Sequence, residues 1–368
     1  MTNLLHLAIA LTIDLGLDRL PSQLQEFKST TTKALHGSTM LHRTPALEDH
    51  RALAGVFYLT SMLASSFKKI DALAYTKYLD NGLIALDQAR EYESDMFLTQ
   101  IVRLQHLAEE THTTETPTAP TQIYTKAFKA DLDRLKQSDQ CREEDVFLRL
   151  QYLAVEILIW ELSLNDLLES KSKPLRAHLD DLYRCIEAIK AFVEVYFSIP
   201  VNYYLTMPFS AFGHFAHAFI ALTRLASLEI EGWDMRALTG TLNYSTVIEE
   251  AAIRFDGATK SSPDGLQVNN EAFGKWAMRV RWMKQVYEAK FLQPSGAEKP
   301  VEGHEALRTF MRSPVGGSGP DAGATAAGVQ QPTPPDDLLS GDFFNYLDEN
   351  FWNSFAGDFD LGYPEMAV

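Results

Sequence analysis

The sequence predicts an all-α protein: a multi-helix domain at residues 1–312, followed by a disordered linker and an acidic-aromatic tail. Apolar residues recur at three- and four-residue spacing through most of this domain, which is the pattern of amphipathic helices. Strands alternating with helices, the mark of an α/β fold, are not indicated. Of the 368 residues, 46% are hydrophobic and 22% are charged, so the chain can bury a substantial core.

The first expected helix covers the N-terminal residues and ends before Gly16 and Pro21. Residues 4–13 are apolar like the core of a signal peptide, but no Lys or Arg precedes them, and Asp14 and Asp18 follow. We therefore expect an amphipathic or buried helix here and no secretion signal. The residues expected on its apolar face are Leu4, Leu7, Ala8, Leu11 and Leu15.

Three further helices are expected before the first long loop. Thr44 and Pro45 predict the start of a helix that runs to Phe67, because threonine caps helices and proline suits the first turn. Asp71 predicts the N-cap of the next helix, which is expected to end near Tyr92. The fourth helix is indicated by an apolar stripe at Phe97, Ile101, Leu104 and Ala108.

Residues 111–122 interrupt the helical pattern with six threonines and two prolines, which predicts an exposed loop between two helices of one bundle. Residues 191–201 are β-branched and aromatic enough for a strand, although no partner strand is indicated nearby. The helix that starts at Phe209 is apolar on nearly all sides, which predicts a central position. The remaining expected helices span residues 123–135, 146–168, 175–197, 209–230, 235–254 and 273–291.

Two changes of composition mark the C-terminal part of the chain. Ten of the 23 residues in 313–335 are Gly or Pro, which predicts a flexible linker because few apolar side chains offset the entropy of ordering. The tail at 336–368 carries eight acids, eight aromatics and no Lys or Arg. Aromatic residues interleaved with acids stay exposed, so they can enter the groove of a partner protein. The expected partner-binding residues are Phe343, Phe344, Leu347, Phe351, Trp352, Phe355, Phe359 and Leu361.

Two other interpretations of the tail remain open. The tail could dock on its own helical domain as a lid, or it could be an inert C-terminus. The pattern of acids and aromatics favours partner binding over both.

No catalytic or metal site is predicted. His214 and His217 lie one turn apart, but no HExxH motif or acid within one turn completes a ligand set, so we expect two core histidines. The Asp180–Asp181 pair lacks the further acid one turn on that a magnesium site needs. Cys141 and Cys185 cannot form a thiolate zinc site by themselves. We therefore expect no enzyme activity and no cofactor in this chain.

The charge of the chain argues against a broad DNA-binding surface. The formal net charge is −16, and the tail contributes half of it because its eight acids face no base. No run of five basic residues occurs, so neither a DNA-binding arm nor a nuclear-import signal is visible. No uncharged apolar run approaches the roughly 20 residues of a membrane span, so no membrane partner is expected.

Residues 42–61, which begin His-Arg-Thr-Pro and end Tyr-Leu-Thr-Ser, resemble the RT-x-EE-x-RA-x-x-G-x-FYL-x-S stretch of fungal binuclear zinc-cluster (Zn2Cys6) transcription factors. Residues 66–79 are similar to the S-x-FRR-x-D-x-x-x-WT-x-YL continuation, with lysines at 68 and 69 in place of arginines and Tyr75 where Trp is frequent. Residues 4–19 and 98–108 resemble two further helices of the same regulatory region.

This resemblance implies an all-α regulatory domain, a nuclear location and an acidic C-terminal segment that activates transcription by contacting coactivators. The six cysteines that hold two zinc ions in the family are absent from this chain. We therefore expect zinc only in a full-length family member. DNA contact is expected only indirectly, or through a zinc cluster that this chain, beginning inside the regulatory domain, lacks. A homodimer or a heterodimer is compatible with the resemblance, as is control of a secondary-metabolite pathway.

Two alternative functions remain open. A regulatory domain without a DNA-binding part could pair with a full-length relative and inhibit it. A helical small-molecule sensor or enzyme could instead use a pocket around Trp160, His214 and His217.

Overall fold

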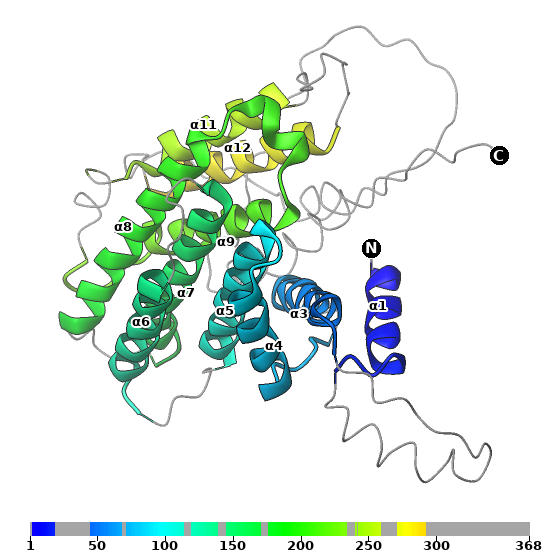
Figure 1. Ribbon diagram of the computed structural model, residues 1–368. Helices are drawn as coiled ribbons and strands as arrows, with labels where there is room; N and C mark the ends of the chain where they lie inside the picture. Colours follow the sequence, from blue (N-terminus) through cyan, green and yellow to red (C-terminus); the bar gives the residue numbers. More distant parts are fainter. Residues whose placement is uncertain are drawn as a thin grey trace, which may run out of the picture. The chain divides into compact units, whose positions relative to one another are not determined.

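In the computed structural model every regular element of the described residues is a helix, which confirms the all-α prediction (Figure 1). The linker at 313–335 and the tail at 336–368 lie outside the described residues, so their boundaries stay predictions. The structure describes residues 2–18, 45–67, 71–113, 119–138, 145–170, 176–233, 240, 242–258 and 271–291.

The chain divides into two compact units. The first unit comprises Met1–Pro200 with Thr206–Leu242, and the second comprises Val201–Leu205 with Asn243–Val368. The helices of the first unit are α1 (Thr2–Asp14), α3 (Leu47–Phe67), α4 (Lys77–Ala89), α5 (Glu93–Thr113), α6 (Thr121–Ser138), α7 (Val146–Ser170), α8 (Arg176–Ser198) and α9 (Phe209–Ala226). The second unit contains α11 (Tyr244–Ala258), α12 (Glu271–Phe291) and most of the 3₁₀ helix η1 (Val201–Thr206).

An acidic side chain in the first turn fixes the start of α3. The Asp49 carboxylate accepts a hydrogen bond from the Ala46 N–H at 3.0 Å, which satisfies a backbone donor that the helix leaves free. The helix therefore begins at Leu47, two residues after the expected start at Pro45. Thr44, the expected N-cap, lies outside the described residues.

The start of α4 differs from the prediction. Asp71 was expected to cap it, but residues 71–76 are not helical, and Thr76 is the N-cap, with its hydroxyl accepting from the Leu79 N–H at 3.2 Å. Thr76 adopts the extended backbone that an N-cap requires, with φ −116° and ψ 156°. At the other end, Arg90 has the left-handed φ of 44°, and its N–H donates to the Leu86 carbonyl at 2.9 Å.

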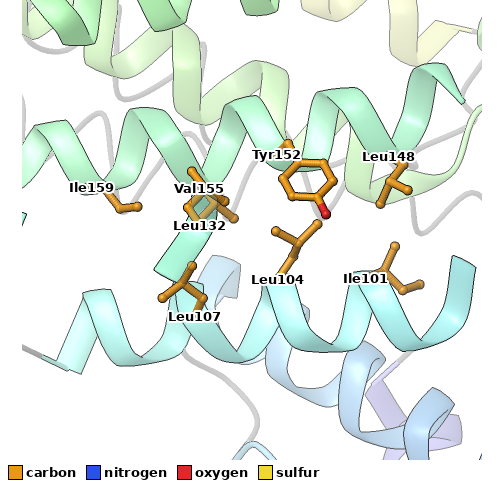
Figure 2. Close-up of a cluster of buried hydrophobic side chains, with 8 residues drawn as sticks. All are labelled: Ile101, Leu104, Leu107, Leu132, Leu148, Tyr152, Val155 and Ile159. Atoms are coloured by element: carbon orange, nitrogen blue, oxygen red, sulfur yellow. The ribbon is translucent and has the colours of Figure 1, made fainter. Parts of the chain in front are cut away.

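Two buried clusters hold α3 to α7 together. In the larger one, three side chains of α5 face four of α7 (Figure 2). Its members are Ile101, Leu104, Leu107, Leu132, Leu148, Tyr152, Val155 and Ile159. The second cluster joins α3, α4 and α5 and contains Leu53, Ala54, Phe57, Leu79, Leu83 and Val102. The apolar stripe predicted for the fourth helix contributes Ile101 and Leu104 to the larger cluster, as its periodicity implied.

The prediction that the helix from Phe209 is central is confirmed. Most residues of α9 are buried, on all sides of the helix, and α9 contacts both α7 and α8. Beyond its C-terminus, the Trp233 indole N–H donates to the Leu225 carbonyl at 3.1 Å. The strand considered for residues 191–201 is not formed, because this segment completes α8 and begins η1.

The packing of α1 contradicts the predicted apolar face. Leu5 is buried against Met62 and Leu63 of α3, with Ile9 and Phe209 packed beside them. The buried side of α1 therefore contains Leu5 and Thr12. It is rotated about the helix axis by about one residue from the predicted stripe. The leucines of that stripe are exposed: Leu4 at 73%, Leu7 at 55%, Leu11 at 49% and Leu15 at 63%.

In the second unit, aromatic rings and ion pairs join α11 to α12. Tyr204 of η1 and Phe273 of α12 both lie against Phe255 of α11, with ring centroids 6.3 and 6.0 Å away. Trp276 meets Phe273 edge-on at 5.1 Å. On the surface, Lys284 and Arg281 pair with Glu249 and Asp256 across the same two helices.

Candidate functional site

The predicted partner-binding tail lies outside the described residues, so its eight proposed contact residues, Phe343 to Leu361, stay predictions. The described residues offer two polar networks to which the sequence pointed. One contains the motif residues between Ala46 and Leu79, and the other contains the histidines of α9.

Arg51 of the motif joins the N-terminal turns of α3 and α5. Its guanidinium donates to both carboxylate oxygens of Asp95, from Nε at 2.7 Å and from Nη2 at 3.0 Å, and Nη2 also donates to Glu91 at 2.7 Å. Asp95 is 1% exposed, and it also accepts a hydrogen bond from the Tyr92 N–H at 3.1 Å. The Arg51 hydrogen bond holds the pKa of Asp95 below its ordinary value, since that bond and the backbone bond outweigh the cost of burial.

Other motif residues make side-chain contacts between helices. The Gln105 amide of α5 donates to the Ser61 hydroxyl of α3 at 3.0 Å. The Thr60 hydroxyl of α3 accepts from the Leu73 N–H at 3.2 Å, which fixes the segment that leads into α4. These polar side chains are buried and hydrogen-bonded, so this part of the motif specifies packing rather than an open site.

Tyr75 and His106 form a stacked pair between the segment before α4 and helix α5. The ring centroids are 3.6 Å apart and the planes are inclined by only 4°. The Tyr75 hydroxyl donates to Asp80 at 3.0 Å. Burial raises the pKa of Tyr75, and the Asp80 hydrogen bond raises it further. The stacked ring and the hydrogen bond to Asp80 hold the phenol in place.

The two histidines of α9 lie in different surroundings. His217 Nε2 forms a short hydrogen bond with the Glu161 carboxylate of α7. Burial, together with the neighbouring His217, lowers the pKa of His214 to about 3, so the His214 ring is neutral. The described residues contain no group of three or more His, Cys, Asp and Glu side chains that could hold a metal ion. Both side chains are half-buried, and His217 is bound to the buried Glu161, so the prediction of two hydrogen-bonded core histidines is met only in part.

Glu161 is the centre of the second network, and sequence reasoning missed it. It is 3% exposed, and Arg224 of α9 approaches it at 3.4 Å while donating to Asn165 at 2.6 Å. Burial alone would raise the pKa of Glu161, but His217 and Arg224 outweigh this effect and lower it. The sequence did contain a signal for Glu161, because it is an acid within the strongly apolar helix predicted at 146–168. A buried acid needs a buried partner.

Among the other sequence candidates, the Cys185 thiol lies close enough to Glu161 and Arg224 for their charges to shift its pKa. The Trp160 ring lies under the Arg184 guanidinium of α8, 5.1 Å from its Cζ. Asp180 is exposed, whereas Asp181 is buried and accepts from the Ser163 hydroxyl at 2.8 Å. Burial raises the pKa of Cys185 well above its ordinary value, which disfavours the thiolate form. Cys141 lies outside the described residues.

The chain is similar in sequence to three proteins named as fungal transcription factors. The chain is 23% identical over 298 residues to Transcription factor opdL of Penicillium oxalicum, covering 76% of this chain and 52% of that protein. It is 25% identical over 321 residues to Transcription factor himD of Aspergillus japonicus, covering 81% of this chain and 52% of that protein. A transcription factor of Aspergillus terreus is 24% identical over 230 residues, covering 55% of this chain and 38% of that protein.

The similarities confirm the resemblance to fungal transcription factors that the sequence motifs predicted. The chain spans about half the length of the curated relatives it matches first. No family model matches the chain, and no solved structure matches it. Among the described helices, none is both long and apolar enough to cross a membrane.

Proposed function

We propose that this chain is a transcriptional regulator of activator type, in which a helical regulatory domain carries an acidic-aromatic activation tail. The observation that carries the proposal is the similarity to three proteins named as transcription factors, over 55–81% of the chain. The target would be a fungal gene set, such as a secondary-metabolite pathway. The chain would act in the nucleus and reach DNA only indirectly, or through a zinc cluster supplied by a longer protein.

The packing of the motif residues supports a regulatory rather than a catalytic domain. Arg51 is bound to Asp95 and Glu91, and Gln105 is bound to Ser61, so these polar groups are already occupied by protein partners. Glu161 likewise contacts His217 and Arg224. A catalytic residue must offer a polar atom to a substrate, whereas the polar atoms of these residues are hydrogen-bonded to neighbouring helices. We therefore propose no enzyme activity and no cofactor.

The tail would supply the contact with coactivators. Its acids repel one another, so its aromatic side chains remain available to solvent and to a partner groove. Phe351, Trp352 and Phe355 fall on one face of a short helix that would form on binding.

A reporter assay tests this proposal. Residues 336–368 are fused to an unrelated DNA-binding domain, and transcription is measured from a promoter that carries its site. We expect activation, and replacing Phe351, Trp352 and Phe355 with alanine should reduce it at least about tenfold, because hot-spot aromatics carry most of the binding free energy. The matched control replaces Asn345, Asn350 and Asn353 of the same segment with alanine and should retain activation. A silent fusion, or equal activity of the two triple variants, would contradict the proposal.

A further inference from the structure

The 3₁₀ helix η1 carries the chain from one compact unit into the other and back. The chain leaves the first unit after Pro200, contributes Val201–Leu205 to the second unit, and returns to the first unit at Thr206. Helix α9 of the first unit then begins at Phe209. The end of η1 and the start of α9 are therefore close along the chain, although most of η1 belongs to the other unit.

One face of η1 is held by α11 and α12. A 3₁₀ helix has three residues per turn, so Val201 and Tyr204 lie on the same face. Tyr204 is 1% exposed, and its ring centroid lies 6.3 Å from that of Phe255 and 6.4 Å from that of Phe273. The preceding residue, Tyr203, is 53% exposed. The residues that hold η1 thus share one face, and they pack on helices of the second unit.

Val201 is in close contact with the backbone of α11 at Gly257. A Cβ atom at residue 257 would stand 3.1 Å from Val201 Cγ1, which is closer than an ordinary van der Waals contact. The approach of η1 to α11 therefore leaves no room for a side chain at this position. Together with the buried Tyr204 ring, this contact fixes both turns of η1 against the second unit.

The first turn of α9 has no side-chain cap. Its N-cap residue is Pro208, which forms no side-chain cap hydrogen bond. The Pro208 carbonyl accepts from the Ala211 N–H at 3.0 Å, whereas the N–H groups before Ala211 have no partner within the helix. Capping side chains typically contribute about 1 kcal/mol to a helix. The order of this turn therefore depends on the packing of Phe209 beside α3 and on the segment that leads into it.

The other connection between the units is much longer. Residues 227–243 lie between the end of α9 and the start of α11, whereas only Met207 and Pro208 separate η1 from α9. A displacement at one end of a long connection can be absorbed by rotations about its many backbone bonds, but a connection of two residues has few such rotations. The short connection is thus the one that can transmit a change.

We propose that η1 is a strap through which the second unit holds the first turn of α9 in place. While Val201 and Tyr204 are seated on α11 and α12, the end of η1 is fixed, and the start of α9 is fixed with it. When the seat of η1 is lost, α9 opens from its N-terminus, because no cap retains this turn. The second unit thereby influences the central helix of the first unit.

Amide hydrogen exchange of the full chain, measured by mass spectrometry, tests the strap. We expect Tyr204→Ala to speed exchange at least about tenfold in η1 and in residues 211–214 of α9, because both segments then open more often. The matched control is Tyr287→Ala in α12, which removes another buried tyrosine of the second unit, one that packs on Tyr244 with ring centroids 4.2 Å apart. This control should leave exchange in both segments within about twofold of the parent chain.

Two results of this experiment overturn the proposal. Exchange that becomes faster in η1 but not in residues 211–214 would show that the strap does not transmit. An equal increase in residues 211–214 for Tyr204→Ala and Tyr287→Ala would show that α9 responds to any loss of stability in the second unit rather than to η1. Far-ultraviolet circular dichroism of each variant checks that the helices are retained.

A second variant displaces η1 without removing a side chain. Gly257→Ala places a methyl group against Val201 and pushes η1 away from α11. We expect exchange in residues 211–214 to become at least about threefold faster. The control is Gly240→Ala, because a Cβ atom there meets nothing within 4 Å, and it should leave this exchange unchanged. Unchanged exchange in Gly257→Ala overturns the proposal. These measurements do not involve transcription, so they are independent of the proposed function.

Discussion

Gly82 of α4 lies so close to His50 of α3 that a Cβ atom at residue 82 would stand 2.6 Å from His50 Nδ1 and 3.1 Å from its Cγ. The His50 imidazole also packs against the Tyr78 ring, with ring centroids 5.7 Å apart. The two helices can approach this closely only because residue 82 has no side chain.

Gly82→Ala is expected to destabilise the first unit by about 1–2 kcal/mol, because overpacking outweighs the gain in helix propensity. Gly55→Ala in α3 is the matched control, since a Cβ there meets nothing within 4 Å. That control should stabilise by about 0.5–1 kcal/mol. Urea unfolding midpoints measure both changes. Combining Gly82→Ala with His50→Ala should recover part of the lost stability. If Gly82→Ala is instead stabilising, the His50 ring moves aside at little cost and the explanation by overpacking is wrong.

Arg90→Gly is expected to stabilise α4 by about 1 kcal/mol, because residue 90 has the left-handed φ of 44° that glycine adopts without strain. Arg90→Ala separates this backbone effect from the loss of the side chain, which is 56% exposed and lies near Asp87. Thermal melting of both variants gives the comparison. If Arg90→Ala raises the midpoint as much as Arg90→Gly, the backbone explanation fails.

The Arg51–Asp95 pair predicts a loss of stability in acid. The pKa of Asp95 is lowered in the folded state, so the pair contributes fully above the unfolded pKa near 3.8 and is lost as the pH falls through the folded value. The difference in unfolding free energy between the parent chain and Asp95→Asn should thus be constant above about pH 5 and shrink below about pH 4.

The control for this pair is Glu91→Gln, because Glu91 binds the same guanidinium but is 46% exposed. Its effect on stability should be small at every pH, as is usual for exposed ion pairs. Urea titrations from pH 7 to pH 3 test both variants. If the unfolding free energies of Asp95→Asn and Glu91→Gln depend on pH in the same way, burial does not make the Asp95 pair stronger than the Glu91 pair.

Glu161→Gln is expected to destabilise the first unit by about 1–2 kcal/mol, because it removes the charge that Arg224 and His217 share in the interior. Asp133→Asn in α6 is the isosteric control, since Asp133 is 44% exposed and pairs with Lys129 on the surface. Its cost should stay below about 0.5 kcal/mol. Equal costs for the two changes would remove the distinction between the buried and the exposed acid.

Helix existence followed from the sequence better than helix orientation did. For α9 the periodicity was decisive, because a helix that is apolar on all sides has to be central. In α1 the same reasoning failed, because two rows of side chains are equally apolar. The buried row contains Leu5 and Ile9, and the predicted row contains Leu4 and Leu7. Only the position of α3 determines which row is buried, and a single helical pattern does not contain that information.

The polar contacts were the least predictable part. Asp71 and Thr76 are both good N-caps, and the choice between them depends on where Leu79 enters the core. The motif identified Arg51, but its partner Asp95 is 44 residues away along the chain. His217 finds Glu161 at a separation of 56 residues. Such pairs arise from the packing of whole helices, so spacing within one helix gives no sign of them.

The buried tryptophans have an optical consequence. Trp233, whose indole N–H is bound to Leu225, and Trp160 belong to the first unit, whereas Trp276 belongs to the second. Indole fluorescence shifts to longer wavelength when water reaches the ring. A chain that retains Trp276 alone would therefore report the melting of the second unit, and one that retains Trp233 alone would report the first. Emission curves that do not coincide would show that the two units unfold separately.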